Sequence, residues 1–428
     1  MRGVRERLPI LTALPKTEAR ERPGATRART AVPHLARLVL AEFRCYRDAT
    51  LETDARPVAL AGPNGAGKTN LLEAISFLAP GRGLRRARLA EVERRPGSGG
   101  AFGADGAVPG PWAVAARLAI VPDGGEIEIG TGRDPAAGEG GAERRLVKID
   151  GQFQKSQAAL AERLAIVWLT PQMDRLFLDG AGDRRRFLDR LVYGFDAAHA
   201  SRLSAYEQAL RERARLLAPQ NGRASGAAEA AWLDGLEAQM AELGVAIAAA
   251  RRDLLQRLRG AAADGFGPFP GAALTLAGAV DDWLGQMPAL AAEEALKRRL
   301  AETRAQDAQQ GGAAAGPHRS DLAVTHLGRG RPAGECSTGE QKALLLAILL
   351  AYARALGLAR GAQPLILLDE VAAHLDRRHR RALFEALLEL GAQAWLTGTD
   401  LEIFAELGAA AQFVAVDEGR LRPLAGAP

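Results

Sequence analysis

Apolar residues along this chain follow two different periods, and each period marks a different region. Short apolar runs bounded by turn residues predict strands at 35–40, 49–52, 112–121, 126–130 and 145–149. From residue 184 to about 304, apolar residues recur at helical spacing and predict helices at 200–217, 228–258 and 290–304. A strand pattern resumes at 322–327, and the remaining residues alternate between helix and buried strand. This order predicts an α/β protein that carries a helical insertion.

One segment of the first region carries the clearest candidate chemistry. Residues 62–69 fit the phosphate-binding pattern G-x-x-x-x-G-K-[ST] between a predicted buried strand at 58–61 and a helix start at 70–75. Glycines let backbone amides point at phosphate oxygens, and the helix N-terminus adds a favourable dipole. Because strand, loop and helix come in the correct order, a chance Gly-rich turn is disfavoured. The segment predicts a site for ATP or GTP built from Gly62, Pro63, Asn64, Gly65, Ala66, Gly67, Lys68, Thr69 and Asn70.

The side chains of this loop have separate expected tasks. Lys68 would reach the β- and γ-phosphates, and Thr69 would bind Mg²⁺ through its hydroxyl. A second buried strand at 364–370 ends in Asp369 and Glu370. At the carboxyl edge of a parallel sheet, Asp369 would hold the Mg²⁺ or its waters, and Glu370 would act as the general base for the attacking water. A strand ending in Asp-Glu is common, but together with a phosphate loop it indicates ATP hydrolysis.

A Ser-x-Gly turn lies between these motifs, at 336–342, before an apolar helix predicted at 343–353. The turn offers a hydroxyl, backbone amides and a helix dipole to an anion. An ordinary helix cap remains open, with Ser337 or Thr338 as the capping residue and Glu340 completing a capping box.

The order of phosphate loop, Ser-Gly turn and Asp-Glu strand resembles the ATP-binding-cassette arrangement. In that arrangement the Ser-Gly turn of one subunit closes on the nucleotide held by the other. The resemblance implies that Ser337 and Gly339 complete the ATP site of a second subunit and that Gln172 senses the γ-phosphate. It also implies that Asp376 lies in a dimer-contact loop and that Thr399 belongs to a γ-phosphate switch strand at 395–400.

Four further segments resemble the RecF family of bacterial recombination and replication-repair ATPases. These are an opening strand with a Phe-Arg-x-Tyr turn, an Arg-Arg-x-Phe-Leu-Asp signature, a Gly-Pro-His-Arg-x-Asp-Leu motif and the Ser-Thr-Gly-Glu-Gln-Lys turn, at 40–47, 170–189, 316–322 and 337–342. Ser320 stands where the family has Asp, and Gly398 stands where Ala is more usual. The resemblance runs from about residue 35 to the C-terminus.

The resemblance implies an α/β fold: an ABC-type P-loop ATPase head, with a mixed sheet flanked by helices and an antiparallel lobe, and an inserted helical arm domain. We expect residues 34–190 to form the first ATPase lobe with the phosphate loop, 191–310 the helical insert, and 311–428 the part that completes the head. Residues 1–33 are basic and show little periodicity, so we interpret them as a disordered extension. A transit-like segment or an upstream start codon are alternatives for this region.

The resemblance also implies a function. We expect a clamp that binds ATP and Mg²⁺, forms a homodimer on ATP, and binds DNA at gaps or at junctions of single-stranded and double-stranded DNA. Slow, DNA-dependent ATP hydrolysis would reset it, and RecR with RecO would be its partners in assisting RecA loading. The alternative is the nucleotide-binding subunit of an ABC transporter or another SMC-like ATPase. Roughly 270 residues separate Lys68 from Ser337, more than is usual in a transporter subunit. The insert of about 120 residues is broken by Pro and Gly and is too short for a long coiled coil.

Composition adds little to this picture. The 428 residues are 47% hydrophobic and 25% charged, and the net charge of +5 suits a polyanionic partner without establishing one. The two cysteines lie far apart in sequence, which favours a reducing compartment without disulfides. No apolar run reaches the length of a membrane span, so we expect a cytoplasmic protein without a membrane partner.

Two arginine clusters are candidates for contact with DNA phosphates. The first comprises Arg82, Arg85, Arg86 and Arg88, and the second Arg184, Arg185, Arg186 and Arg190. Salt bridges or solvated loops are an equal alternative for the first cluster. The second cluster contains the RecF-like signature, which favours a structural or switch role. Arg44 is a candidate contact to the base or ribose of the nucleotide.

Overall fold

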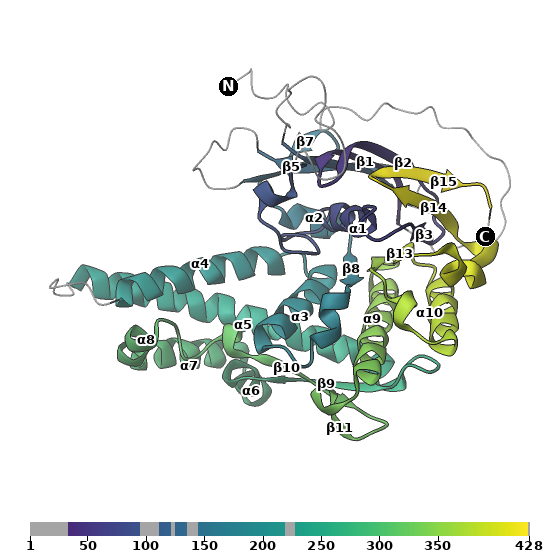
Figure 1. Cartoon of the computed structure of the whole chain (residues 1–428). Helices are drawn as coiled ribbons and strands as arrows, with labels where there is room; N and C mark the ends of the chain where they lie inside the picture. Colours follow the sequence, from purple (N-terminus) through teal and green to yellow (C-terminus); the bar gives the residue numbers. More distant parts are fainter. Residues whose placement is uncertain (1–32, 95–110, 121–124, 135–143, 219–226, 427–428) are drawn as a thin grey trace, which may run out of the picture. The chain divides into compact units, whose positions relative to one another are not determined.

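The computed structural model describes residues 33–94, 111–120, 125–134, 144–218 and 227–426 (Figure 1). The extension expected at 1–33 lies outside the described residues except for Pro33. Contacts divide the chain into two units, residues 1–173 with 353–428, and residues 174–352. The predicted helical insert at 191–310 lies wholly within the second unit.

The first unit contains a six-stranded, mostly parallel sheet. Its order is β15-β14-β3-β13-β12-β8, formed by Arg420–Leu424, Gln412–Asp417, Val58–Ala61, Ala394–Gly398, Leu365–Leu368 and Ile166–Leu169. Only β15, at the edge, pairs antiparallel. Strands β3, β8, β12 and β13 are buried along their whole length, which explains their nearly continuous apolar sequences. The carboxyl ends of β3 and β12 carry the phosphate loop and the Asp-Glu pair.

A second sheet in the same unit is antiparallel throughout. Its order is β2-β1-β4-β5-β6-β7, formed by Tyr46–Glu52, His34–Phe43, Ala113–Ile120, Gly125–Arg133, Arg145–Ile149 and Gln152–Phe153. The strands predicted from alternating and apolar runs are present with small shifts of their ends. The mixed sheet and the antiparallel lobe confirm the predicted fold class.

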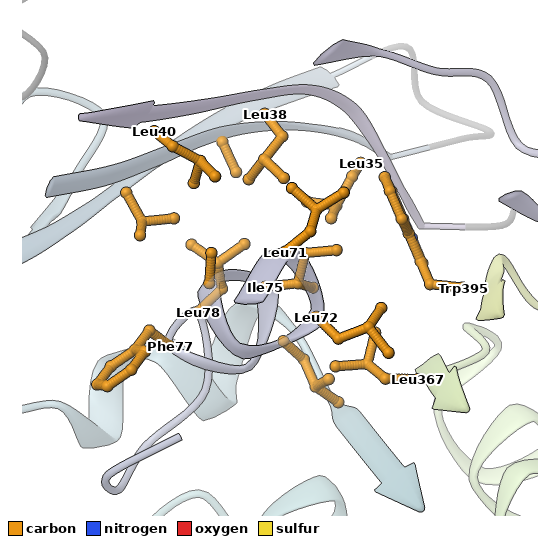
Figure 2. Close-up of a cluster of buried hydrophobic side chains, with 14 of the residues drawn as sticks. Leu35, Leu38, Leu40, Leu71, Leu72, Ile75, Phe77, Leu78, Leu367 and Trp395 are labelled. Carbon is orange, nitrogen blue, oxygen red and sulfur yellow. The ribbon is translucent and has the colours of Figure 1, made fainter. Parts of the chain in front are cut away.

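The main core of the first unit surrounds helix α1, Lys68–Ser76, which follows the phosphate loop. Figure 2 shows Leu71, Leu72 and Ile75 of α1 between leucines of β1 on one side and Leu367 of β12 on the other, with Trp395 of β13 along the edge of the cluster. Each of these side chains is almost completely buried. Because α1 is packed on both sides, the start of the helix, and hence the phosphate loop, has a fixed position.

The second unit is mainly helical. Helices α3 to α8 span Ala181–Phe195, His199–Leu217, Ala227–Asp264, Ala279–Gln286, Ala289–Glu302 and Arg304–Gln310. The helices predicted at 200–217 and 228–258 correspond to α4 and α5. The helix predicted at 290–304 corresponds to α7, which ends just before α8 begins. A small antiparallel sheet, β11-β10-β9, is formed by Arg331–Pro332, Asp321–His326 and Ala272–Ala277. The sequence pattern did not predict β9, because its partly exposed residues follow a Pro-rich and Gly-rich turn.

The apolar helix predicted at 343–353 is longer than expected and is α9, Thr338–Arg360. By length and composition alone it could cross a membrane. Most of it is buried inside the protein, which is the pattern of a core helix.

Candidate functional site

The phosphate loop links the end of β3 to the start of α1, and glycine is required at two of its positions. A Cβ at Gly62 would lie 2.0 Å from the Val416 carbonyl oxygen, and Gly67 has φ +117° in the left-handed region. The loop is anchored from outside, because the Tyr46 hydroxyl donates a hydrogen bond to the Gly67 carbonyl at 3.0 Å. Among the described residues no side chain caps the N-terminus of α1, so its first amides remain available to an anion.

Lys68 is folded back onto the loop that precedes it. Its Nζ donates to the carbonyl oxygens of Gly62 at 2.6 Å and of Pro63 at 2.9 Å. Burial lowers the pKa of Lys68, and the negative charges of Glu370 and Asp369 act in the opposite direction. The ammonium group therefore lies inside the loop, where a bound phosphate chain would meet it.

Asp369 is the centre of a hydrogen-bond chain at the carboxyl edge of the parallel sheet. Its Oδ1 accepts from the Thr69 hydroxyl at 2.9 Å and from the Thr397 hydroxyl at 2.8 Å. Burial raises the pKa of Asp369, and the hydrogen bonds from Thr397 and Thr69 oppose this shift. A hydroxyl and a carboxylate held within 3 Å of each other are oxygen ligands of the kind that Mg²⁺ prefers, so Thr69 and Asp369 fit the predicted metal site.

Thr397 was missed by the sequence analysis, which selected Thr399 from the same segment. The Thr397 hydroxyl donates to Asp369 and accepts from the Glu370 backbone amide at 2.8 Å, so one side chain connects both acidic residues. Thr399 lies beyond the end of β13, is exposed, and bonds to Asp400. The sequence signal that could have identified Thr397 is a lone hydroxyl residue in the apolar segment Ala394–Gly398, because a buried polar group needs a hydrogen-bond partner.

The backbone of Glu370 is unusual in a way that matches a functional residue. Its φ of +54° lies in the left-handed region, which is costly for a residue with a Cβ. The hydrogen bond from its amide to Thr397 holds this conformation. The side chain is only partly buried, which is compatible with the contact to water that a general base needs.

Two arginines with predicted ligand contacts are bound to the protein itself. Glu73 of α1 is completely buried, and its carboxylate accepts from Arg44 Nε at 2.9 Å and Nη2 at 2.7 Å, and from Arg85 Nη1 at 3.0 Å. Arg85 also donates to the Asn70 side chain at 2.6 Å. This cluster braces α1 against the turn after β1 and gives Arg44 a structural role, and the contact of Arg44 to the base or ribose of the nucleotide stays a prediction. DNA contacts by Arg82, Arg85, Arg86 and Arg88 stay a prediction.

The Ser-Gly turn belongs to the second unit and forms a complete capping box. The Ser337 hydroxyl donates to Glu340 Oε2 at 2.9 Å, the Ser337 amide donates to the same oxygen at 2.9 Å, and the Glu340 amide donates back to the hydroxyl at 3.3 Å. These bonds, with Arg329 at 3.0 Å, lower the pKa of Glu340 to about 2. A Cβ at Gly339 would meet nothing within 4 Å, so the turn is open to an approaching group.

The remaining predicted site residues are exposed. Gln172 lies in the short 3-10 helix Pro171–Arg175 that follows β8. Asp376 caps helix α10, Arg377–Leu390, by accepting from the His379 amide at 2.8 Å. Their roles toward nucleotide and second subunit stay predictions.

The Gly-Pro-His-Arg motif, for which the sequence suggested no role, connects the elements of the second unit. Arg184 of α3 forms a bidentate pair with Asp321 at 2.7 and 2.8 Å, and Arg185 donates to the Ser320 carbonyl at 2.6 Å. The Tyr206 hydroxyl and His318 Nδ1 lie 2.8 Å apart. Burial lowers the pKa of His318 to about 4, so the ring is neutral at pH 7. The motif and the second arginine cluster therefore form a structural joint.

Comparisons with known proteins agree on one family. The family model for the RecF/RecN/SMC N-terminal domain matches residues 34–419. Proteins named DNA replication and repair protein RecF are 47% identical over 393 residues in Mesorhizobium japonicum, covering 91% of this chain and 98% of the relative, and 48% identical over 399 residues in Caulobacter vibrioides, covering 91% and 98%. A solved structure of the recombination mediator protein RecF with ATPrS, in the RecFOR pathway, superposes with a TM-score of 0.75 at 22% identity, covering 92% of this chain and 99% of that chain. The corresponding RecF–ATP structure gives 0.74 at 22% identity, covering 92% and 100%, and at this identity both show the fold alone.

Proposed function

This chain belongs to the RecF family of ATPases, and from that premise we propose that it is an ATP-driven clamp that binds DNA during recombinational repair. The observation that carries the proposal is the connected chain Thr69–Asp369–Thr397–Glu370 beside the phosphate loop. A transporter subunit, the alternative weighed from the sequence, is not favoured, because the relatives that match over nearly the whole chain are named RecF.

In this proposal ATP binds to the loop at 62–69, with the amides of α1 and the Lys68 ammonium facing its phosphates. Thr69 and Asp369 would hold Mg²⁺, which would supply positive charge to the phosphates. Glu370 accepts the proton of the attacking water. The left-handed backbone of Glu370 and its amide bond to Thr397 fix the direction from which the carboxylate reaches that water.

Thr397 gives the site a way to sense its own state. Its hydroxyl has one proton, which it donates to Asp369 while accepting from Glu370. The Thr397 hydroxyl therefore links the position of the Asp369 carboxylate to the backbone of Glu370. We infer that Thr397 keeps Asp369, the proposed metal ligand, and Glu370, the proposed base, in a fixed position relative to each other.

We propose that two subunits close on ATP, with Ser337 and Gly339 of each meeting the nucleotide of the other and Asp376 contacting the second subunit. The Glu340 carboxylate now occupies the Ser337 amide and hydroxyl, so a γ-phosphate would have to displace it. Arg329, at 3.0 Å from Glu340 Oε1, is positioned to hold the displaced carboxylate.

The family supports the remaining parts of the proposal. The clamp binds DNA at gaps or at junctions of single-stranded and double-stranded DNA. Its ATP hydrolysis is slow and stimulated by DNA, and it acts with RecR and RecO to assist RecA loading. Gln172 and Thr399 sense the γ-phosphate. The protein acts in the cytoplasm.

The test is the solution mass of a Glu370→Gln variant with and without Mg-ATP, measured by light scattering. We expect a monomer that becomes a dimer only with ATP, because the variant binds ATP and does not hydrolyse it. Ser337→Arg on the same background should abolish the dimer while ATP binding persists, and Lys68→Met should abolish both. A protein that binds ATP and stays monomeric would reduce the Ser337 turn to a helix cap and defeat the clamp.

A further inference from the structure

Helix α10 begins with four arginines within five residues, Arg377, Arg378, Arg380 and Arg381, interrupted only by His379. We propose that this group, the α10 arginine cluster, is a binding site for the phosphodiester backbone of DNA. The proposal rests on the clamp function above, because it presupposes that the protein binds DNA. It adds a site for the DNA backbone that lies outside the sequence motifs and outside the first arginine cluster.

The cluster lies at the end of the helix where positive charge is least favourable. The N-terminus of a helix carries a partial positive charge, so cations there are repelled by the helix as well as by one another. The first turn of α10 contains no acidic residue, and the capping carboxylate of Asp376 already bonds to the amide and ring of His379. The other carboxylates paired with the cluster, Glu406 and Glu385, lie outside this first turn. An arrangement that opposes local stability is expected where it serves a ligand.

The partners of these arginines within the protein are weak. Arg377 is 87% exposed and bonds to Glu406 at 3.2 Å, and Arg381 is 70% exposed and bonds to Glu385 one turn further along α10 at 2.8 Å. Solvent-exposed pairs of this kind contribute little. The Arg378 side chain is exposed and has no partner among the described residues. An external anion therefore meets one guanidinium that is unpaired among the described residues, that of Arg378, and two whose exposed ion pairs it can replace at little cost.

A second basic helix in the same chain, α7, has its positive charges at the end where the helix dipole favours them. Helix α7 carries Lys297, Arg298 and Arg299 near its C-terminal end, where positive charge is favourable, and glutamates precede them by one turn. All three are exposed. Ordinary helix electrostatics accounts for the basic residues of α7 and leaves those of α10 unexplained.

The chemistry of the α10 cluster favours a nucleic acid over a protein partner. Protein interfaces are built on buried aromatic and apolar anchors, and the one large apolar side chain that α10, described throughout, exposes is Leu388, near the opposite end of the helix from the cluster. Guanidinium groups bind phosphate oxygens through two parallel hydrogen bonds, and Arg377 and Arg381 lie one turn apart on the same face with Arg378 beside them. Contacts of this kind hold a DNA backbone without reading its sequence.

The experiment compares two triple variants of the full-length chain. Arg377→Gln with Arg378→Gln and Arg381→Gln removes three charges from α10, and Lys297→Gln with Arg298→Gln and Arg299→Gln removes three from α7. Binding of a labelled gapped duplex in Mg-ATP is measured by fluorescence anisotropy between 50 and 200 mM salt. Each phosphate contact releases about 0.9 counterions, so loss of three contacts should make the slope of log K against log salt less negative by about 2 to 3. The affinity of the α10 variant should be at least about tenfold weaker. The α7 variant should stay within about twofold of the unchanged protein.

Two further readouts separate this role from a structural one. The melting temperature of the α10 variant should change little, because the loss of two weak exposed ion pairs is offset by the loss of repulsion at the helix N-terminus. Its ATP affinity and its ATP-driven change in mass without DNA should be unchanged. Loss of dimerisation would mean that the cluster contacts a second subunit, and an equal loss in both variants would mean diffuse attraction; either result overturns the proposal. If the protein without substitutions does not bind DNA in the presence of ATP, both the clamp function and the α10 site are refuted. If the α10 variant binds DNA normally, only the α10 site is refuted.

Discussion

Replacing Asp189 by Asn should destabilise the second unit more than any exposed charge change in it. Asp189, on α3, accepts from Arg251 Nε at 2.7 Å and Nη2 at 2.8 Å, and its Oδ1 lies 2.9 Å from His199 Nε2. Arg251, on α5, is 2% exposed and also donates to the Pro317 carbonyl at 2.7 Å. The Asp189 carboxylate therefore joins α3 to α4 and α5, and its partner Arg251 extends the connection to the Gly-Pro-His-Arg motif.

The magnitude follows from what the substitution leaves behind. Asn keeps the volume and one acceptor oxygen, but it leaves the buried Arg251 charge without a counter-charge. Removing one partner of a buried pair costs about 3–5 kcal/mol, and the retained acceptor and the Pro317 bond place this case near 3 kcal/mol. A domain is stable by about 5–15 kcal/mol, so the loss is a large fraction of the total.

The same carboxylate predicts a pH dependence. Burial alone would raise the pKa of Asp189, but the Arg251 charge and the His199 hydrogen bond outweigh it, and the pKa lies below its usual value of about 3.9. A carboxyl group with a lowered pKa in the folded state stabilises the fold above its unfolded pKa. This contribution is lost as the pH falls from about 4 through the folded pKa. Asp189→Asn should therefore show a smaller loss of stability on acidification than the unchanged protein.

The assay is urea unfolding followed by circular dichroism at pH 7 and in steps below pH 4, where the pH-dependent contribution of Asp189 is lost. The control is Asp183→Asn on the same helix, where the carboxylate pairs with Arg186 and both side chains are nearly half exposed. This control should cost no more than about 0.5 kcal/mol. A loss below about 1 kcal/mol for Asp189→Asn, or equal losses in both variants, would refute the structural role given to the buried cluster.

Two further predictions concern the nucleotide site. Thr397→Val keeps the shape of the side chain but leaves the Glu370 amide without its acceptor and Asp369 without one donor, so single-turnover ATP hydrolysis should fall about 10-fold to 100-fold with ATP affinity changed much less; normal turnover would remove Thr397 from the mechanism. Gly62→Ala would place a Cβ 2.0 Å from the Val416 backbone oxygen, so the loop must shift and binding of a fluorescent ATP analogue, measured by titration, should be lost; retained affinity would mean that β14 moves away at little cost.

Local sequence was sufficient for the elements whose signals are short-range. The loop at 62–69 was identified because its glycines and Lys68 lie at fixed spacing, and the buried strands because both of their faces are apolar. The 38-residue helix α5 was predicted because long apolar periodicity is unambiguous. Strand β9 was not predicted, because its pattern depends on pairing with β10, which follows more than 40 residues later.

The sequence by itself determined the fold class, the phosphate loop and the acidic pair, because these depend on residue type and on neighbours within one element. Tertiary structure decided which groups meet. Only the pairing of β13 with β12 brings the Thr397 hydroxyl to Asp369 and Glu370, and only the packing of α1 brings Arg44 and Arg85 to the buried Glu73. An arginine in a motif has the same sequence whether it binds a phosphate or a buried carboxylate. The difference lies in which side chain the fold places within about 3 Å of it, and that is set by contacts between residues far apart in the chain.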